Sequence, residues 1–276
     1  TNANGQLGQN DKTQYSSPVQ IPGTTWSQVS GAGRNNFMAT KTDGTLWAWG
    51  QNQYGNLGLP ATANTDLSSP TQIPGTTWSK IGSGFIAGMA IKTDNTLWSW
   101  GYNGDGQLGQ NNKVKYSSPV QIPGTNWNTL TIAGGTGGGA IKTDGTLWMW
   151  GSNGNGQLGQ NGAIPDGGNS SPIQIPGTTW VSASMGANSA SAIKTDGTLW
   201  MWGRNHEGQL GFNNRTDYSS PTQIPGTTWS ISRNSSNSVA STMAIKTDNT
   251  LWAWGENIHG YDNTTVTKSS PVQIPG

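Results

Sequence analysis

One ten-residue motif, repeated five times, constrains the fold of this 276-residue chain more than any other feature. The motif Lys-Thr-Asp-(Gly/Asn)-Thr-Leu-Trp-x-Trp-Gly occupies residues 41–50, 92–101, 142–151, 194–203 and 246–255. A period of about 51 residues indicates an array of equivalent units that pack on one another. We therefore interpret residues 1–276 as a single repeat domain, with repeats of approximately 1–50, 51–101, 102–151, 152–203 and 204–255 and a partial repeat over 256–276.

Two further motifs recur with the same period. Gly-Gln-Leu-Gly, or a near copy, occupies residues 5–8, 55–58, 106–109, 156–159 and 208–211, and its last counterpart is Gly-Tyr-Asp-Asn at 260–263. Ser-Ser-Pro-x-Gln-Ile-Pro-Gly occurs six times, with its first proline at Pro18, Pro70, Pro119, Pro172, Pro221 and Pro271. The segments between these two motifs vary in length, which is typical of surface loops.

The pattern within one repeat predicts β-structure. In residues 45–49 two tryptophans alternate with a leucine and an alanine, and this period of two is that of a β-strand. Asp43 and Gly44 precede this run and predict a hairpin turn. Asn95 and Asn249 replace the glycine in two copies, and asparagine also tolerates the positive φ that such a turn requires.

Each repeat contains four such runs, which we name strands A to D. They read TWSQVS (25–30), FMATKT (37–42), TLWAWG (45–50) and SPVQIP (17–22) in their first copies. Proline is excluded from central strands, so strand D is expected at the edge of its sheet. Glycines at the A–B end, such as those at 134–139, suit strands that converge on a narrow channel. Four-stranded units at this period predict the blades of an all-β propeller.

The 15 tryptophans occupy only three positions of the repeat. A residue type that recurs at the same position of every repeat is expected to make a contact that every repeat makes. We therefore expect these rings to pack one blade on the next. They are Trp26, Trp78, Trp127, Trp180 and Trp229 in strand A, and the strand C pairs Trp47 and Trp49, Trp98 and Trp100, Trp148 and Trp150, Trp200 and Trp202, and Trp252 and Trp254.

With these strands placed, the repeats resemble those of the RCC1-like β-propellers. The resemblance rests on LWAWGQNQYGNLG (46–58) and LWMWGSNGNGQLG (147–159), each followed by a proline-containing edge strand, and it covers the whole chain. The founding eukaryotic member is a chromatin-bound guanine-nucleotide exchange factor, whose repeats usually hold a histidine seven residues before the turn aspartate. The cognate positions here are Asn36, Ala87, Gly137, Ser189 and Ser241. The chain looks more like the bacterial or phage members, which include surface proteins and a secreted enzyme inhibitor.

Composition excludes several classes of function. The chain has 14 basic and 13 acidic residues, a net charge of +1, and no cysteine. This charge does not favour a nucleic-acid partner, and the lack of cysteine removes thiolate metal sites and cysteine nucleophiles. No apolar run is long enough to span a membrane. Only 10% of residues are charged, which suits an extracellular, cell-surface or virion-surface protein.

Catalytic residues are scarce. The two histidines, His206 and His259, lie in loops after strand C, and we find no paired carboxylates or nucleophile–histidine set. The five aspartates of the KTD motif are interpreted as turn residues, each beside a lysine in a solvated pair of little energetic value. We therefore predict no catalytic, cofactor-binding or metal-binding residues, and a protein that is not an enzyme.

Specific binding must come from positions that differ between repeats, and the A–B segments vary most. Arg34, Phe37, Phe85, Ile86 and Arg233 stand out there against small, neutral cognates. Aromatic and arginine side chains are frequent anchors of protein interfaces. These five residues are our candidates for a protein-binding surface.

One D strand is left without a sheet, because the chain contains five A–B–C units and six D strands. The unmatched strand comprises Ser16, Ser17, Pro18, Val19, Gln20, Ile21 and Pro22. An exposed edge strand is a liability. Three arrangements would resolve it: further repeats that close a ring of six or seven blades, exchange of this strand with a neighbouring copy to form a filament, or an open superhelix.

The near-identity of the repeats favours assembly over specific recognition. We expect a non-enzymatic structural protein of a bacterial or phage surface or extracellular structure, which partners copies of itself and polymerises head to tail by strand exchange. The alternative is a secreted protein-binding module, an enzyme inhibitor or adhesin, that uses one propeller face. A guanine-nucleotide exchange factor is the third and least favoured expectation. No nucleic-acid partner, cofactor or membrane insertion is expected.

Overall fold

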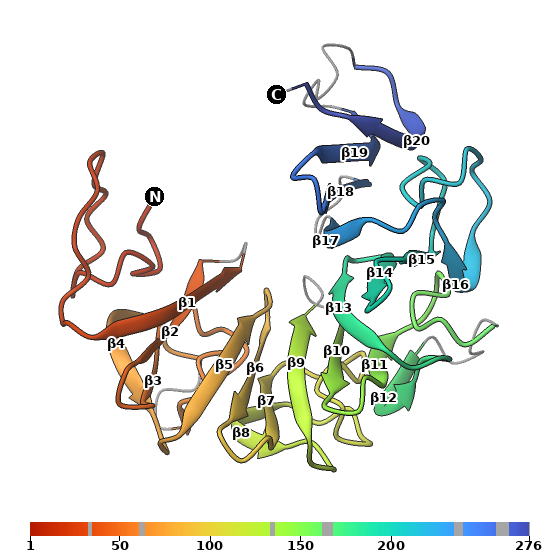
Figure 1. The fold of residues 1–276 in the computed structure, drawn as a ribbon. Coiled ribbons are helices and arrows are strands. Elements are labelled where there is room, and N and C mark those ends of the chain that lie inside the picture. Colours follow the sequence, from red (N-terminus) through yellow and green to blue (C-terminus); the bar gives the residue numbers. More distant parts are fainter. Residues whose placement is uncertain are drawn as a thin grey trace.

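The structure is a computed structural model that describes residues 1–32, 35–60, 64–132, 136–161, 168–234, 240–257 and 265–275. Its strands form five antiparallel four-stranded sheets, arranged as consecutive blades along an open arc (Figure 1). The all-β propeller fold expected from the repeats is confirmed. In Figure 1 the first strand of each blade lies on the concave side of the arc and the last strand lies on its outer side.

The strands correspond to the expected A, B, C and D runs. Blade 1 contains β1 (Trp26–Ala32), β2 (Asn36–Lys41), β3 (Leu46–Gly50) and β4 (Leu67–Ile73). Blade 2 contains β5 (Trp78–Ser83), β6 (Ala87–Lys92), β7 (Leu97–Gly101) and β8 (Tyr116–Gln121). Blade 3 contains β9 (Trp127–Ile132), β10 (Gly137–Lys142), β11 (Leu147–Ser152) and β12 (Gly168–Gln174). Blade 4 contains β13 (Trp180–Met185), β14 (Ser189–Lys194), β15 (Leu199–Gly203) and β16 (Tyr218–Gln223). Blade 5 contains β17 (Trp229–Asn234), β18 (Ser241–Lys246), β19 (Leu251–Gly255) and β20 (Lys268–Gln273).

The structural unit is out of phase with the repeat boundaries chosen from the sequence. Blade 1 runs from residue 26 to residue 73, whereas the first sequence repeat was placed at 1–50. Residues 1–25 contain no strand, so five of the six expected D strands form and Ser16–Pro22 lies outside any sheet. A strand D needs a strand C beside it, and the chain has no strand C before residue 16.

The turn between strands B and C has the same hydrogen bonds in every blade. In blade 1, Asp43 Oδ1 accepts bonds from the Thr45 amide at 3.0 Å and from Thr45 Oγ1 at 2.7 Å. Thr45 Oγ1 in turn accepts a bond from Trp47 Nε1 at 2.9 Å. Gly44 has a φ of 78°, and its counterpart Asn95 has a φ of 62°, so the exchange of glycine for asparagine preserves the turn.

The repeated lysine lies near enough to the turn aspartate to lower the pKa of that carboxyl, but its direct contacts are with tryptophan rings, which the sequence did not suggest. In each blade its Nζ lies over two indole rings, those of the strand A tryptophan and the first strand C tryptophan, at 4.1–4.9 Å from the ring centroids. Among the described residues none of these lysines makes an ion pair with a turn aspartate. The electron-rich faces of both rings attract the ammonium.

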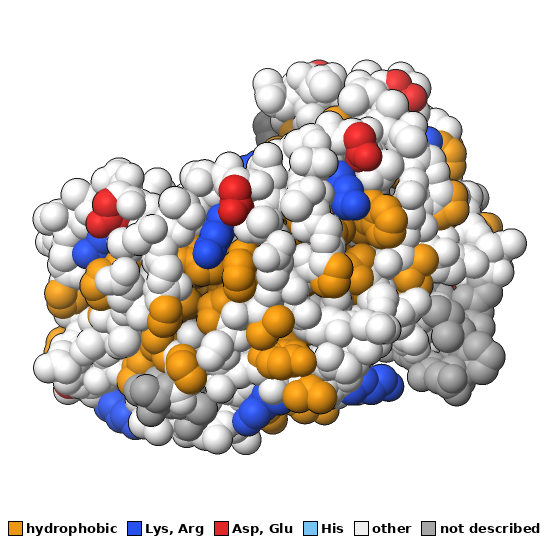
Figure 2. Space-filling model, turned by 90° about the horizontal axis from the view of Figure 1, so that it is seen from below, with side chains coloured by type: hydrophobic (Ala, Val, Ile, Leu, Met, Phe, Trp, Pro, Cys, Tyr) orange, Lys and Arg blue, Asp and Glu red, His pale blue; other side chains and the backbone are white. Residues whose placement is uncertain are grey.

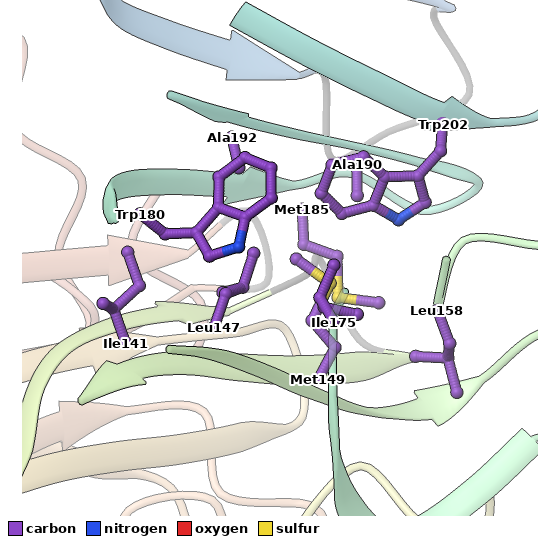
Figure 3. Close-up of a cluster of buried hydrophobic side chains, with 10 residues drawn as sticks. All are labelled: Ile141, Leu147, Met149, Leu158, Ile175, Trp180, Met185, Ala190, Ala192 and Trp202. Carbon is purple, nitrogen blue, oxygen red and sulfur yellow. The ribbon is translucent and has the colours of Figure 1, made fainter. Parts of the chain in front are cut away.

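The hydrophobic core lies between blades rather than within them. Figure 3 shows one junction, where Leu147, Met149 and Ile175 of blade 3 face Trp180 and Trp202 of blade 4. The other three junctions repeat this arrangement. The face of a blade that meets the next blade in chain order is here called its trailing face, and the opposite face its leading face.

A glycine-rich loop joins neighbouring blades. The second strand C tryptophan of each blade donates its indole N–H to a carbonyl of the Gly-x-Leu-Gly loop from the preceding repeat. Examples are Trp49 Nε1 to Gln6 O at 3.0 Å and Trp254 Nε1 to Gln209 O at 2.8 Å. The leucine of the loop enters the same junction, as Leu158 does in Figure 3. By contrast, the five strand A indole N–H groups are buried without a hydrogen-bond partner.

The junctions allow a matched comparison of one repeated leucine. Leu147 is 0% exposed against blade 4, whereas its cognate Leu251 on blade 5 is 36% exposed. Leu147→Ala should lower the free energy of unfolding by about 2–5 kcal/mol, because it leaves a cavity in a packed junction. Leu251→Ala should cost roughly 1 kcal/mol, because water already reaches the site. Chemical denaturation checks both variants, and equal losses would contradict this account of the core.

The link before strand A offers a stabilising substitution. Thr25, Thr77 and Thr179 have φ of 67–69°, and Asn126 adopts 66° at the same position of blade 3. A β-branched residue is strained in the left-handed region, where asparagine is tolerated. Thr179→Asn should therefore raise the free energy of unfolding by about 0.5–1 kcal/mol. Asn126→Thr is the reverse control and should lower the free energy of unfolding. A loss of stability in Thr179→Asn and a gain in Asn126→Thr, measured by chemical denaturation, would refute the argument.

The turn aspartates predict acid sensitivity. Hydrogen bonds from the following threonine hold the pKa of Asp43, Asp94, Asp144, Asp196 and Asp248 below the usual value of a carboxyl group. A pKa that is lower in the folded state stabilises the protein above the unfolded pKa of about 4, and this contribution is lost as the pH falls through the folded pKa. Replacing all five by asparagine should flatten the fall in unfolding temperature at acidic pH. Asp43→Asn alone is the comparison and should flatten the slope less than the fivefold replacement does.

Candidate protein-binding surfaces

The variable segments gather on one face of the arc. In an antiparallel blade the A–B turn and the C–D loop lie at the same end, and hydrogen bonds join them. The Gln51 amide donates to Asn35 O at 2.9 Å in blade 1, and the Arg204 amide donates to Asn188 O at 2.9 Å in blade 4. The opposite face carries the B–C turns and the D–A links, whose sequences are nearly identical in all repeats. We call the first of these the variable face.

The four described residues among the five predicted for protein binding do not form one cluster. Phe37 is half-buried and stacks on Trp49, with ring centroids 6.0 Å apart, so it packs within blade 1. Phe85 and Ile86 are half-buried side by side in the A–B turn of blade 2. Arg233 is exposed, but it lies within β17 of blade 5. Arg34 lies outside the described residues.

A tyrosine pair on the variable face was missed by the sequence reasoning. Tyr54 and Tyr102, from consecutive C–D loops, meet edge to face with ring centroids 5.4 Å apart. The Tyr102 amide donates to Ile86 O at 2.8 Å, which joins the pair to one predicted segment. The signal was present in the sequence, because the cognates of Tyr54 are Asp105, Asn155 and Glu207. Attention to the A–B segments alone left it out.

The trailing face of blade 5 carries exposed hydrophobic side chains. Met243 is 43% exposed and Leu251 is 36% exposed, while Ile245 and Ile274 are half-buried. Their hydrophobic cognates in blades 1 to 4 are 0–3% exposed: Met38 and Met89; Ile91, Ile141 and Ile193; Leu46, Leu97, Leu147 and Leu199; Ile73, Ile122, Ile175 and Ile224. The contrast arises because no blade covers this face in the structure.

The leading face of blade 1 is exposed in the complementary way. Trp26 is half-buried, whereas the other four strand A tryptophans are 1–3% exposed. Leu7 is also half-buried, whereas the equivalent loop leucines, Leu57, Leu108, Leu158 and Leu210, are 0% exposed. Beside this face the segment 16–20 is exposed along its whole length. One end of the arc therefore exposes the trailing face of blade 5, and the other end exposes the leading face of blade 1. These are the two surfaces that meet at a junction between neighbouring blades.

One cluster of charged and titratable groups in the described part of the chain surrounds His206. His206 Nε2 lies 3.3 Å from Asp217 Oδ2, and His206 Nδ1 accepts a bond from Arg204 Nε at 3.1 Å, but this cluster is exposed. No group of three or more potential metal-ligating side chains occurs within the described ranges.

Figure 2 shows a face on which most side chains are uncharged. Over the same described ranges, no helix is long and apolar enough to cross a membrane.

A groove between β16 and β20 has a volume of about 540 Å³. Its lining includes Trp229, Trp252 and Lys246. The ammonium of Lys246 lies 4.8 Å and 4.1 Å from the centroids of these two rings. The lysine therefore covers the ring faces in this groove. A sugar ligand, which would bind by stacking on such faces, would have to displace it.

Comparison with known proteins places these features in a family. The sequence profile of the Regulator of chromosome condensation (RCC1) repeat matches residues 43–84, 94–138, 144–193 and 196–235, and a second profile of that repeat matches 26–56 and 180–209. The Ultraviolet-B receptor UVR8 of Arabidopsis thaliana is 26% identical over 93% of this chain and 59% of its own length. Human Protein RCC2 is 33% identical over 42% of this chain and 23% of its own length.

Solved structures agree on the fold. Human WBSCR16 superposes with a TM-score of 0.83 and 20% identity, over 100% of this chain and 75% of that protein. Prp20p of Saccharomyces cerevisiae superposes with a TM-score of 0.75 and 17% identity, over 87% of this chain and 61% of that protein. This chain spans less than two thirds of the length of UVR8 and of RCC2. The matched profiles cover more than half of its residues, and the chain belongs to the RCC1 repeat family.

Proposed function

We propose that this chain is a non-enzymatic assembly protein whose copies join head to tail through the ends of the arc. The observation that carries the proposal is the exposed trailing face of blade 5, where Met243, Ile245, Leu251 and Ile274 stand at positions that are buried in other blades. A contiguous exposed apolar surface of this kind marks an interaction site. Its partner must be shaped like the leading face of a blade.

The energy available at such an end is substantial. Full burial of one exposed aliphatic side chain contributes about 1.5–3 kcal/mol, and each of the four partly exposed side chains on blade 5 would contribute part of that amount. Association loses translational and rotational freedom, which offsets part of this gain. The half-buried Trp26 and Leu7 at the other end of the arc add to it. Head-to-tail contacts between identical subunits form open chains unless their rotation closes a ring.

The relatives support a role in binding rather than in catalysis. One is named a receptor, and the Prp20p structure is described with its binding to Gsp1p and histones. By analogy this chain is a scaffold for protein contacts. Its placement at a bacterial or phage surface, or outside the cell, stays a prediction from its low charge and near-identical repeats.

A protein-binding module is the second candidate, and the location of the variable segments favours it. They lie on one face, and Tyr54, Tyr102, Phe85 and Ile86 provide aromatic and aliphatic side chains there. Aromatic residues are enriched in interface cores. An inhibitor or adhesin of this kind acts as a monomer. The exchange-factor role has least support, because the family histidine is absent from all five cognate positions.

Assembly is tested on the purified chain over a range of protein concentrations. Sedimentation velocity should show species larger than one chain whose share rises with concentration, and electron microscopy should show linear particles of varying length. A single species with the mass of one 29.0 kDa chain at every concentration would refute assembly and favour the binding module.

A further inference from the structure

We propose that residues 1–23 of one copy complete blade 5 of a second copy, by covering its trailing face and by supplying its strand D. This inference rests on the assembly function proposed above and names the surfaces and the strand that perform it. The occupant of the trailing face of blade 5 is thus a second copy of this chain.

The junction between blades 4 and 5 is the template. There Ile193, Leu199 and Ile224 of blade 4 pack against Trp229 and Trp254 of blade 5, with Leu210 of the connecting loop between them. The corresponding residues at the free ends are Ile245 and Leu251 on blade 5, and Trp26, Trp49 and Leu7 at blade 1; Ile21 of the exchanged strand takes the place of its cognate Ile274. Apolar side chains of the same kind therefore face each other in the proposed contact.

Burial in the structure agrees with this pairing on both sides. Leu251 is 36% exposed, and Leu7 and Trp26 are half-buried, while the template residues Leu199, Leu210 and Trp229 are 0%, 0% and 3% exposed. Trp49 is already buried, because the loop at residues 5–8 covers it and Gln6 O accepts its indole N–H. The first copy of the loop is thus in the position that a junction requires.

The unpaired segment has the sequence of the strand it would replace. Residues 16–23 and 269–276 are both Ser-Ser-Pro-Val-Gln-Ile-Pro-Gly. β20, which contains the second copy, pairs with β19 through Ala253 and Val272. Val19 is the cognate of Val272, so it would lie opposite Ala253 after exchange. In the exchange, β19 loses its ladder hydrogen bonds to β20 and forms the same set of bonds to residues 16–22 of the other copy.

The connecting loops indicate which of the two copies is used. The loop before segment 16–23 keeps the Gly-Gln-Leu-Gly sequence at 5–8, whereas the loop before β20 reads Gly-Tyr-Asp-Asn at 260–263. Only the first retains the leucine that fills a junction. Residues 1–23 therefore bring the intact loop and the strand together, already joined to blade 1.

The N-terminal segment does not reach blade 5 of the same copy. In Figure 1 the N-terminal segment and blade 5 lie on opposite sides of the opening of the arc. Four junctions with nearly the same side chains set the angle between successive blades. Closing the opening within five blades would strain all four of these packed junctions.

The contact is tested with one charged substitution on each end. Leu251→Lys alters the trailing face and Leu7→Lys alters the leading side, while Val114→Lys, at a loop residue 56% exposed, is the control. Each end variant should weaken self-association at least tenfold in sedimentation velocity, and the control should not. A mixture of the two end variants should form a 1:1 dimer and nothing larger, because each retains one functional end. Circular dichroism checks that all variants fold.

Strand exchange is tested by engineered disulfides, because the chain has no cysteine of its own. Paired strands hold opposite Cα atoms about 4.5–5.5 Å apart, which a disulfide can bridge. Val19→Cys combined with Ala253→Cys should give a ladder of covalent oligomers after mild oxidation, lost on reduction. Val114→Cys combined with Ala253→Cys is the control and should remain monomeric on a denaturing gel.

The outcomes separate this inference from the proposed function. Association that persists in both lysine variants leaves assembly standing and overturns the junction. A disulfide confined to one chain overturns the second copy as occupant. Association that is sensitive to both lysines without intermolecular disulfides overturns the strand exchange. A chain that never associates overturns both proposals.

Discussion

The fold depends on the packing of tryptophans from one blade into the aliphatic face of the blade before it. Every junction uses the same elements: a strand A tryptophan, the second strand C tryptophan, and the leucine and isoleucine of the preceding blade. No blade has a closed core of its own, so each depends on its neighbours for burial. The repetition of ten residues follows directly, because every blade must present the same two faces.

Around this contact the remaining recurrent residues position the tryptophans. The aspartate and threonine of each turn hold the first strand C indole, and the glycine-rich loop accepts a bond from the second. The lysine covers the outer rings. These groups account for the recurrence of the aspartate, threonine, lysine and loop glycines, and the longest variable segments lie on the other face.

Much of this could be predicted from the sequence because the signals are local. The period-two pattern of strand C, the Asp-Gly turn and the proline-edged strand D each depend on near neighbours. The ring contacts of the lysine were missed because its partners, two indoles on two other strands, become neighbours only in the folded sheet. Tyr54 was visible as a variable position, but its contact with Tyr102 crosses between blades and could not be read from either loop alone. The different exposures of Leu147 and Leu251 also follow from position in the array and not from the residues themselves.

The uncovered trailing face of blade 5 has a consequence for how the chain melts. In a linear array each unit is stabilised by its interfaces with both neighbours, so a terminal unit has one such contribution fewer. Local opening therefore begins at the ends, where hydrogen exchange is fastest, and the middle blades are protected longest. Anything that caps an end adds its binding free energy to the stability of that blade. The ends of the arc thus couple the persistence of the fold to the concentration of whatever covers them.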